Sequence, residues 1–427
     1  MIIHTIKKGE TVYSISSLYG VSSQLTIINN GLSGIENSLP EGLSIVILEP
    51  SETYTVKEND TLLSVASSNG ISLNTLYRNN IILRGEDLIF PGQTLVISYK
   101  DSPVFDFSIG GYAYTNISES LLNETLPFMK VFMPFTYGFT ENAQIVELDD
   151  EAVLSRLFHY NAGEAFLHLS TLTEDGNFSN NLSSMLLSNK SLWSVLADNV
   201  ISIVEEKNYS GVDIDFEFLN SSDRYIYPEF ISYMRQRLNS ISKKLIVAVP
   251  PKTSATQTGQ LYEGIDYKLL GEAADYVLCM TYEWGYTYGP PLPVSPIPSI
   301  RRVLDYAVTE IPPEKIYMGI SNYGYDWKLP FIIGESRAES LSNTSAIRLA
   351  SMTGSTILYS GEYEAPHFNY TDSSSTLHEV WFEDARSIFA KLKLIEEYSL
   401  FGGLYWNLNR QNPQNLAVLS SVMKYDR

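Results

Sequence analysis

The chain has 427 residues, of which 44% are hydrophobic and 18% charged. This composition is typical of a globular protein, and the length allows a large core and more than one domain. The net charge of -20, from 49 acidic and 29 basic residues, argues against partners held through phosphate, namely nucleic acids and anionic membranes. A neutral or polyhydroxylated partner fits this charge better.

The cysteine and histidine content argues against disulfide-bonded and metal-binding classes of protein. Cys279 is the single cysteine, so an intramolecular disulfide is impossible, and the 5 histidines show no metal-ligand spacing. We therefore expect neither a metal nor another cofactor. No run reaches the roughly 18 to 20 apolar residues of a membrane span. The start, "MIIHTIKKGETVYSI", lacks the charged and apolar segments of a secretory signal peptide.

The first hundred residues contain a repeat. "HTIKKGETVYSISSLYGVS" from His4 aligns without a gap on "YTVKENDTLLSVASSNGIS" from Tyr54. Each copy predicts a short strand, an amphipathic helix beginning near Thr11 or Thr61, a second helix ending near an Asn pair, and a closing strand. The hydroxyls of Thr11 and Thr61 are suited to cap the exposed N–H groups of the first helices.

This repeat resembles LysM modules, small βααβ domains that bind chains of N-acetylglucosamine. We place the modules at residues 1–49 and 50–99. The Gly-Asp-Thr loop of the family corresponds to Gly9-Glu10-Thr11 and to Asn59-Asp60-Thr61, each with one departure. The resemblance implies that these residues contact the glycan, and two linked sites gain effective concentration on a polymer.

Residues 100–427 alternate predicted strands with helical patterns. The strand candidates are "DFSIGGYAY", "KVFMPFTYGF", "EAFLHLSTL", "GVDIDFEF", "KLIVAVPP", "DYVLCMTYEW", "KIYMGISNYGYDW" and "FGGLYWNLNR". These alternating units favour a (β/α)₈ TIM barrel. Between the last two, residues 329–383 interrupt the pattern and include the strand-like "STILYS". We expect a small α+β insertion there that walls one side of the barrel mouth, followed by a helix over Asp384 to Tyr398.

The fourth predicted strand carries acids at alternate positions. Asp213, Asp215 and Glu217 therefore share the face that points into the barrel, and the apolar residues from Val212 to Phe218 share the face under the helices. The acids climb toward the C-terminal mouth, where barrel active sites lie. Neighbours on one face are about 7 Å apart. Their repulsion should keep a proton on at least one acid near neutral pH, as a general acid requires.

Four motifs resemble family 18 glycoside hydrolases, which are (β/α)₈ enzymes. "SGVDIDFE" is similar to the signature DGxDxDxE, with Ser210 in the leading position. "MTYEW" resembles the Met-x-Tyr-Asp of the sixth strand, with Glu283 in place of Asp. "NYGYDW" resembles the Tyr-Gly motif of the seventh strand, and "GGLYWNLNR" supplies Trp406 on the eighth. Their order and spread identify the segment as a member of this family.

The resemblance implies a role for each site residue, with the acetamido group of the substrate as nucleophile. Glu217 would protonate the departing glycosidic oxygen and then activate water. Asp215 would hold the acetamide N–H and stabilise the oxazolinium ion, while Asp213 shares a proton with it. Tyr282 would hydrogen-bond the acetamide carbonyl. The expected substrate contacts are Trp406, as the apolar floor of the sugar site, with Met280, Tyr323, Trp284 and Tyr112.

Modules that bind N-acetylglucosamine before a family 18 barrel imply peptidoglycan or chitin as substrate. The arrangement is similar to the spore cortical fragment-lytic enzymes of spore-forming bacteria. This similarity implies an N-acetylglucosaminidase that acts on glycan strands or cortex fragments of peptidoglycan, located in the spore or cell wall without classical secretion. We expect a monomer.

Other functions remain open. A chitinase or another endo-N-acetylglucosaminidase would use the same site. A non-catalytic lectin of this family usually loses the acid at the position of Glu217, which is present here. Muramidase activity is disfavoured, because the lactyl group of muramic acid would crowd the acetamide pocket.

Overall fold

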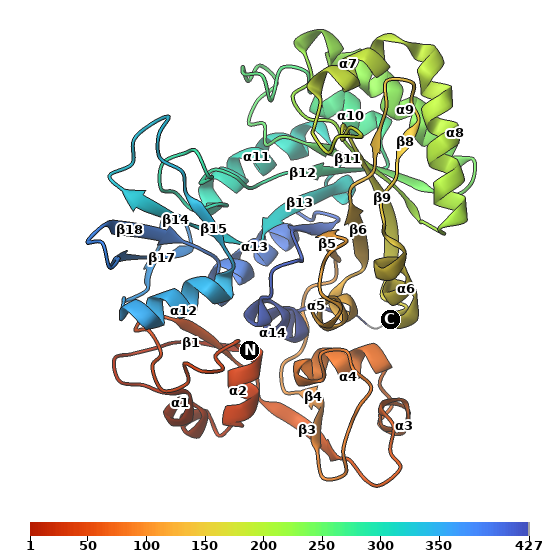
Figure 1. Cartoon of the computed structure of the whole chain (residues 1–427). Coiled ribbons are helices and arrows are strands. Elements are labelled where there is room, and N and C mark those ends of the chain that lie inside the picture. The colour runs from red at the N-terminus through yellow and green to blue at the C-terminus, as the bar shows by residue number, and fades with distance from the viewer. Residues whose placement is uncertain (426–427) are drawn as a thin grey trace.

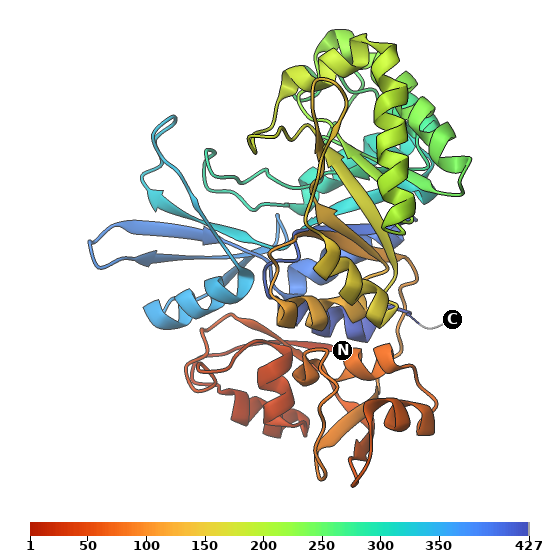
Figure 2. The same cartoon turned by 45° about the vertical axis from the view of Figure 1, so that its right-hand side comes forward.

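The computed structural model describes residues 1–425 as two small N-terminal units, a closed barrel and a five-stranded sheet beside the barrel (Figure 1). In both views the two units lie next to each other beneath the barrel, and the sheet projects to one side (Figure 2). Among these residues, no helix combines the length and the apolar character needed to cross a membrane.

The N-terminal units have the predicted order of elements. The first contains β1 (Ile2–Thr5), α1 (Val12–Tyr19), α2 (Ser23–Asn29) and β2 (Ser44–Ile47). The second contains β3 (Pro50–Thr55), α3 (Leu62–Ser68), α4 (Leu73–Asn79), the 3-10 turn η1 (Ile81–Leu83) and β4 (Thr94–Tyr99). The strands of each unit pair antiparallel. The predicted caps are confirmed, since Thr11 and Thr61 each form a capping box with the serine three residues later.

The predicted barrel is confirmed. Its parallel strands close in chain order, and each falls within one of the expected stretches. They are β5 (Ser108–Tyr114), β6 (Val131–Phe135), β9 (Glu164–Ser170), β10 (Gly211–Asp215), β11 (Lys244–Val249), β12 (Tyr276–Cys279), β13 (Ile316–Ser321) and β19 (Gly402–Trp406). Apolar side chains fill the lumen below the mouth, among them Met133, Phe166 and Leu404.

Helices surround the barrel. They are α5 (Glu119–Thr125), α6 (Glu151–Tyr160), α7 (Asn180–Ser188), α8 (Lys190–Glu206), α9 (Ile226–Asn239), α10 (Tyr267–Ala273), α11 (Ile297–Glu310), α13 (Ala385–Glu397) and α14 (Pro413–Val422). Short elements connect them: a hairpin of β7 (Gly138–Phe139) and β8 (Ile145–Val146), and the 3-10 turns η2 (Leu126–Phe128), η3 (Ser221–Arg224) and η4 (Pro313–Lys315).

The side sheet is an insertion between β13 and α13. It contains β14 (Gly324–Leu329), β15 (Glu339–Leu341), α12 (Asn343–Thr353), β16 (Leu358–Ser360), β17 (Ala365–Thr371) and β18 (Leu377–Trp381). The stretch "KIYMGISNYGYDW", expected as one strand, forms two: β13 ends at Ser321, and β14 joins the antiparallel sheet. Most of "NYGYDW" therefore belongs to the insertion, because the chain leaves the barrel at Asn322 and Tyr323.

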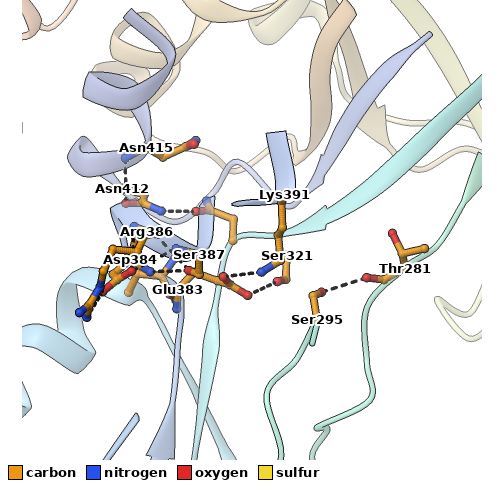
Figure 3. A network of polar contacts seen from close by, with 12 residues as sticks. Thr281, Ser295, Ser321, Glu383, Asp384, Arg386, Ser387, Lys391, Asn412 and Asn415 are labelled. Atoms are coloured by element: carbon orange, nitrogen blue, oxygen red, sulfur yellow. Dashed lines mark hydrogen bonds and ion pairs between the residues drawn. The ribbon is translucent and has the colours of Figure 1, made fainter. Parts of the chain in front are cut away.

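A buried polar network fixes the chain where it returns from the insertion to the barrel (Figure 3). Lys391 and Glu383, both almost fully buried, pair at 2.7 Å, and the Ser321 hydroxyl donates to Glu383 at 3.0 Å. Asp384 caps the predicted helix α13 by accepting from two backbone N–H groups, and Arg386 pairs with Asp384 at 2.6 Å. These contacts hold β13, β18 and α13 together beside the barrel mouth.

The N-terminal units pack on the rest of the chain. Apolar residues of the first unit, including Ile6, Val12 and Ile45, share one buried cluster with Ala346, Ile347 and Phe368 of the insertion. The second unit joins the core of the barrel. Gly42 lies so close to the insertion that an added Cβ would be 1.8 Å from the carbonyl oxygen of Ile357.

Candidate active site

A cavity of about 360 Å³ opens at the carboxyl ends of the barrel strands. The last residues of several barrel strands line it: Tyr114, Phe135, Ser170, Asp215 and Trp406. The loops that follow add further walls, with Glu217 after β10 and Tyr282 after β12. The cavity is therefore on the face where barrel enzymes place their catalytic groups.

Asp213 is the deepest of the three predicted acids and is fully buried. The hydroxyl of Tyr112 donates to its Oδ2 at 2.8 Å. Burial raises the pKa of Asp213 to about 7, while His168 acts to lower that pKa and the charge of Asp215 acts to raise it. A carboxyl group in this state exchanges its proton near neutral pH, as the sharing of a proton with Asp215 would require.

Glu217 lines the cavity two residues beyond the end of β10. Burial, followed by the negative charges of Asp215 and Glu283, raises the pKa of Glu217 to about 8. The side chain thus keeps its proton at neutral pH, which is the state of a general acid. One acid of the stretch thus keeps its proton as expected, but burial is the larger cause, and the repulsion that the sequence suggested comes second.

The predicted alternation of faces ends before Phe218. Phe216 lies on the predicted face under the helices: it is 1% exposed and stacks on Tyr227 and Phe230. Phe218 does not: its φ of 55° turns the chain, and the side chain is 40% exposed and lines the cavity. The expectation that Phe218 packs under the helices is wrong, because the strand stops at Asp215 and a residue with positive φ no longer follows strand geometry.

Tyr282 enters the cavity from the segment after β12. Burial is the main cause that holds the pKa of Tyr282 well above its usual range, and the charges of Asp215 and Glu217 add to it, so its hydroxyl keeps its proton. The ring passes close to Gly319 of β13, where an added Cβ would lie 2.6 Å from Cε1 of Tyr282. A glycine at this position therefore makes room for the ring, a requirement that the sequence alone does not reveal.

Trp406 and Met280 form an apolar part of the cavity wall. The Trp406 ring contacts Phe135 at 4.8 Å and Tyr112 at 5.6 Å between ring centroids, both edge to face. Phe178, from the loop after β9, also lines the cavity. Neighbouring rings restrict the indole, which suits it to stack against a sugar.

The remaining predicted contacts lie behind the cavity wall. The Tyr323 hydroxyl donates to Glu283, and that of Tyr325 approaches the same carboxylate at 3.3 Å. Tyr323 is 4% exposed and does not line the cavity, so it positions Glu283. Trp284 is also outside the lining and packs against the main core.

His168 is a site residue that the sequence reasoning missed. Its Nε2 lies 3.6 Å from Oδ2 of Asp213 and 3.7 Å from Oδ2 of Asp215. The spacing of the histidines bears only on metal binding and gives no sign of this position. The available signal was alternation: Phe166 points into the lumen, so His168, two residues later on the same strand, points there too.

In the N-terminal units, the predicted glycan-contacting residues form tight turns. Glu10 accepts from the Lys7 backbone at 2.8 Å and contacts His4 at 2.9 Å. Asp60 accepts from the Lys57 backbone at 2.7 Å and from the Tyr54 hydroxyl at 2.9 Å. Gly9 and Asn59, at φ 84° and 70°, allow the turns, and Thr11 and Thr61 end them as helix caps. Both acids thus have structural partners already.

A cavity of about 610 Å³ adjoins the turn of the second unit. Asp60, Thr61 and Leu88 line one side, and His159 and Tyr160 of α6 line another. Within residues 1–425, no cluster of three or more histidine, cysteine or carboxylate side chains has a geometry that could hold a metal ion.

Comparison with known families gives two matches. Residues 107–411 match glycosyl hydrolases family 18, and residues 4–47 and 54–98 match the LysM domain. The chain is 33% identical to the cortical fragment-lytic enzyme of Bacillus anthracis, over 98% of this chain and 97% of that protein. It is 34% identical to that of Bacillus subtilis (strain 168), over 86% of this chain and 97% of that protein.

Solved structures give the same grouping. The spore cortex-lytic enzyme SleL of Bacillus megaterium QM B1551 is 34% identical, with a TM-score of 0.83 over 99% of this chain and 98% of that one. A chitinase from Chromobacterium violaceum ATCC 12472 is 26% identical, with a TM-score of 0.68 over 74% of this chain and 98% of its own. The similarity to the spore cortex-lytic enzyme thus extends over the N-terminal units as well as the barrel.

Proposed function

Since this chain belongs to the family 18 glycosyl hydrolases and carries two LysM domains, we propose that it cleaves spore cortex peptidoglycan at the bond after N-acetylglucosamine. The observation that carries the proposal is Glu217, a carboxyl group with a pKa of about 8, in a cavity that also holds Asp215, Tyr282 and Trp406. The relatives named as cortex-lytic enzymes match over both the modules and the barrel.

The proposed reaction retains the configuration of the sugar and uses the substrate's acetamido group. Glu217 gives its proton to the glycosidic oxygen while the bond from that oxygen to C1 breaks. The acetamido oxygen forms a new bond to C1, which yields a cyclic oxazolinium ion. Water then attacks C1, passes a proton back to Glu217 and opens the ring, so that Glu217 ends protonated as it began.

The other site residues bind and stabilise. Asp215, at the end of β10, would accept the acetamide N–H and face the positive charge of the oxazolinium ion. The Tyr282 hydroxyl would donate to the acetamide oxygen and direct it toward C1. Asp213 would hold the shared proton below, and Trp406 with Met280 would form the apolar floor.

The LysM modules, at residues 1–49 and 50–99, would hold the glycan while the barrel of residues 100–427 cleaves it. The turns Gly9-Glu10-Thr11 and Asn59-Asp60-Thr61 would present backbone groups to the sugar, since Glu10 and Asp60 are occupied by contacts within the module. With this substrate, the protein would act in the spore, in its coat or cortex region, or in the cell wall.

Digestion of purified cortex fragments and of chitin oligomers in parallel tests the proposal. Borohydride reduction followed by mass spectrometry identifies the sugar at the new reducing end. We expect N-acetylglucosamine at the reducing ends of cortex products, with Glu217→Gln as the inactive control. Cleavage of chitin alone would instead make the protein a chitinase, a function that its similarity to the Chromobacterium enzyme keeps as the second candidate.

A further inference from the structure

His168 takes no part in the reaction steps above, although it lies at the base of the site. The side chain is 1% exposed, and its Nε2 is almost equally distant from Asp213 and Asp215, at 3.6 and 3.7 Å. The imidazole therefore stands between the two carboxylates. An opposite charge at this distance changes the ionisation of a carboxyl group strongly.

The other ring nitrogen of His168 has a fixed partner. Nδ1 lies 2.6 Å from the hydroxyl oxygen of Thr136, which is also 3.0 Å from the carbonyl oxygen of Tyr137. A hydroxyl has one proton, and donating it to the carbonyl leaves the oxygen free to accept from Nδ1–H. Nε2 is then the nitrogen that can gain or lose a proton, and it faces the carboxylates.

Besides the two acids, two aromatic rings contact the imidazole. From β5, the Tyr112 ring stands at 90° to the imidazole at 5.3 Å, and from β6, Phe135 lies at 4.8 Å. From β10, Asp213 and Asp215 each leave their Oδ1 without a hydrogen-bond partner. The acids can thus accept a proton or hydrogen bond, and His168 is the group beside both that can carry positive charge.

We propose that His168 is a positioning residue that sets the charge of the Asp213–Asp215 pair. As imidazolium, its positive charge lies beside both carboxylates, so that the one proton shared by the pair rests on Asp213 and the negative charge on Asp215, where the oxazolinium ion forms. The proton stays on Asp213 while the positive charge develops, so none is consumed. Without this cation, the pair would lose its proton only at higher pH, because His168 acts to lower the pKa of Asp213.

The first test is the pH profile of kcat/KM for His168→Gln, which keeps an N–H donor and removes the charge. The acidic limb reports ionisation of the Asp213–Asp215 pair, and the alkaline limb reports Glu217. We expect the acidic limb to move up by roughly one to three pH units, with the alkaline limb unchanged. An equal loss of activity at every pH, or an unchanged profile, would overturn the proposal.

His378 supplies a matched control. It is also a buried histidine between two aspartates, at 2.7 Å from Asp326 and 3.4 Å from Asp372 in the insertion. His378→Gln should leave the pH profile in place, whatever its effect on thermal stability. A shift of the same size in this variant would show that the effect is general and would refute a specific role of His168.

The second test keeps His168 in place and needs no substrate. ¹⁵N NMR of the histidine rings follows the proton on Nε2 during a pH titration, with His168→Gln assigning the signal. Coupling between two titrating groups is reciprocal, so Asp213→Asn should move this titration to lower pH. No movement would overturn the inference. Because only the kinetic test depends on the proposed function, failure of cortex cleavage and failure of this inference are distinguishable.

Discussion

Replacement of Glu283 by glutamine tests how the site keeps Glu217, the proposed general acid, protonated. The amide oxygen of Glu283→Gln can still accept from Tyr323 and Tyr325, so the contacts survive while the negative charge is lost. That charge is one of the causes that raise the pKa of Glu217. Its removal should therefore lower the pKa of Glu217.

The size of the effect follows from the order of the causes. The pKa of Glu217 rises from its ordinary 4.5 to about 8, first through burial, then through Asp215, and least through Glu283. The smallest of three contributions is at most a third of that rise, or about one pH unit. With that shift, the protonated fraction at pH 8 falls about five-fold, whereas at pH 6 it hardly changes.

The assay is kcat/KM on cortex fragments from about pH 5 to 10, where the alkaline limb reports the acid of the free enzyme. We expect this limb to move to lower pH in Glu283→Gln. Glu397→Gln, at an exposed glutamate paired with Arg301, is the control and should not move it. A stationary limb, or an equal loss at pH 6 and pH 8, would refute the electrostatic reasoning.

Further predictions concern catalysis, the module contact and the buried ion pair. Glu217→Gln should lower kcat by about 10² to 10⁴ while calorimetry shows unchanged oligosaccharide binding; an active variant would contradict the mechanism. Gly42→Ala and Gly92→Ala carry the same backbone strain, at φ 82° and 88°, but only Gly42 faces a close carbonyl. Urea unfolding should show that Gly42→Ala lowers the free energy of unfolding by clearly more than the roughly 1 kcal/mol expected of Gly92→Ala. Equal decreases in the two variants would contradict the contact between Gly42 and the insertion. Lys391→Met leaves the buried Glu383 without its cation and should lower the free energy of unfolding by about 3–5 kcal/mol. The double variant with Glu383→Leu should recover most of that loss of unfolding free energy, and no recovery would count against the pair.

Local periodicity predicted much of this fold. Each barrel strand is a short apolar stretch whose alternation survives in the structure, and the three acids of the fourth stretch lead from the lumen to the cavity. Helix α13 begins at Asp384, where a carboxylate can cap it. These features depend on neighbours in sequence, so the sequence was sufficient to find them.

Features that depend on neighbours in space could not be predicted. The sequence does not mark that β13 ends at Ser321 or that Phe218 adopts a positive φ, because both depend on where other segments pack. His168 is ordinary among apolar residues until β10 places two carboxylates beside it. Tyr323 supports Glu283 from behind, although the motif suggested contact with the substrate.

The buried cluster that joins the first module to the insertion has a consequence for truncating such chains or exchanging their domains. Sequence families divide this protein after the second module, but Ile6, Val12 and Ile45 complete a core whose other half lies at Ala346, Ile347 and Phe368. A fragment beginning at the barrel would expose that apolar half to water and invite aggregation. The first module, which looks like an interchangeable accessory in the sequence, is thus part of the buried core of the insertion.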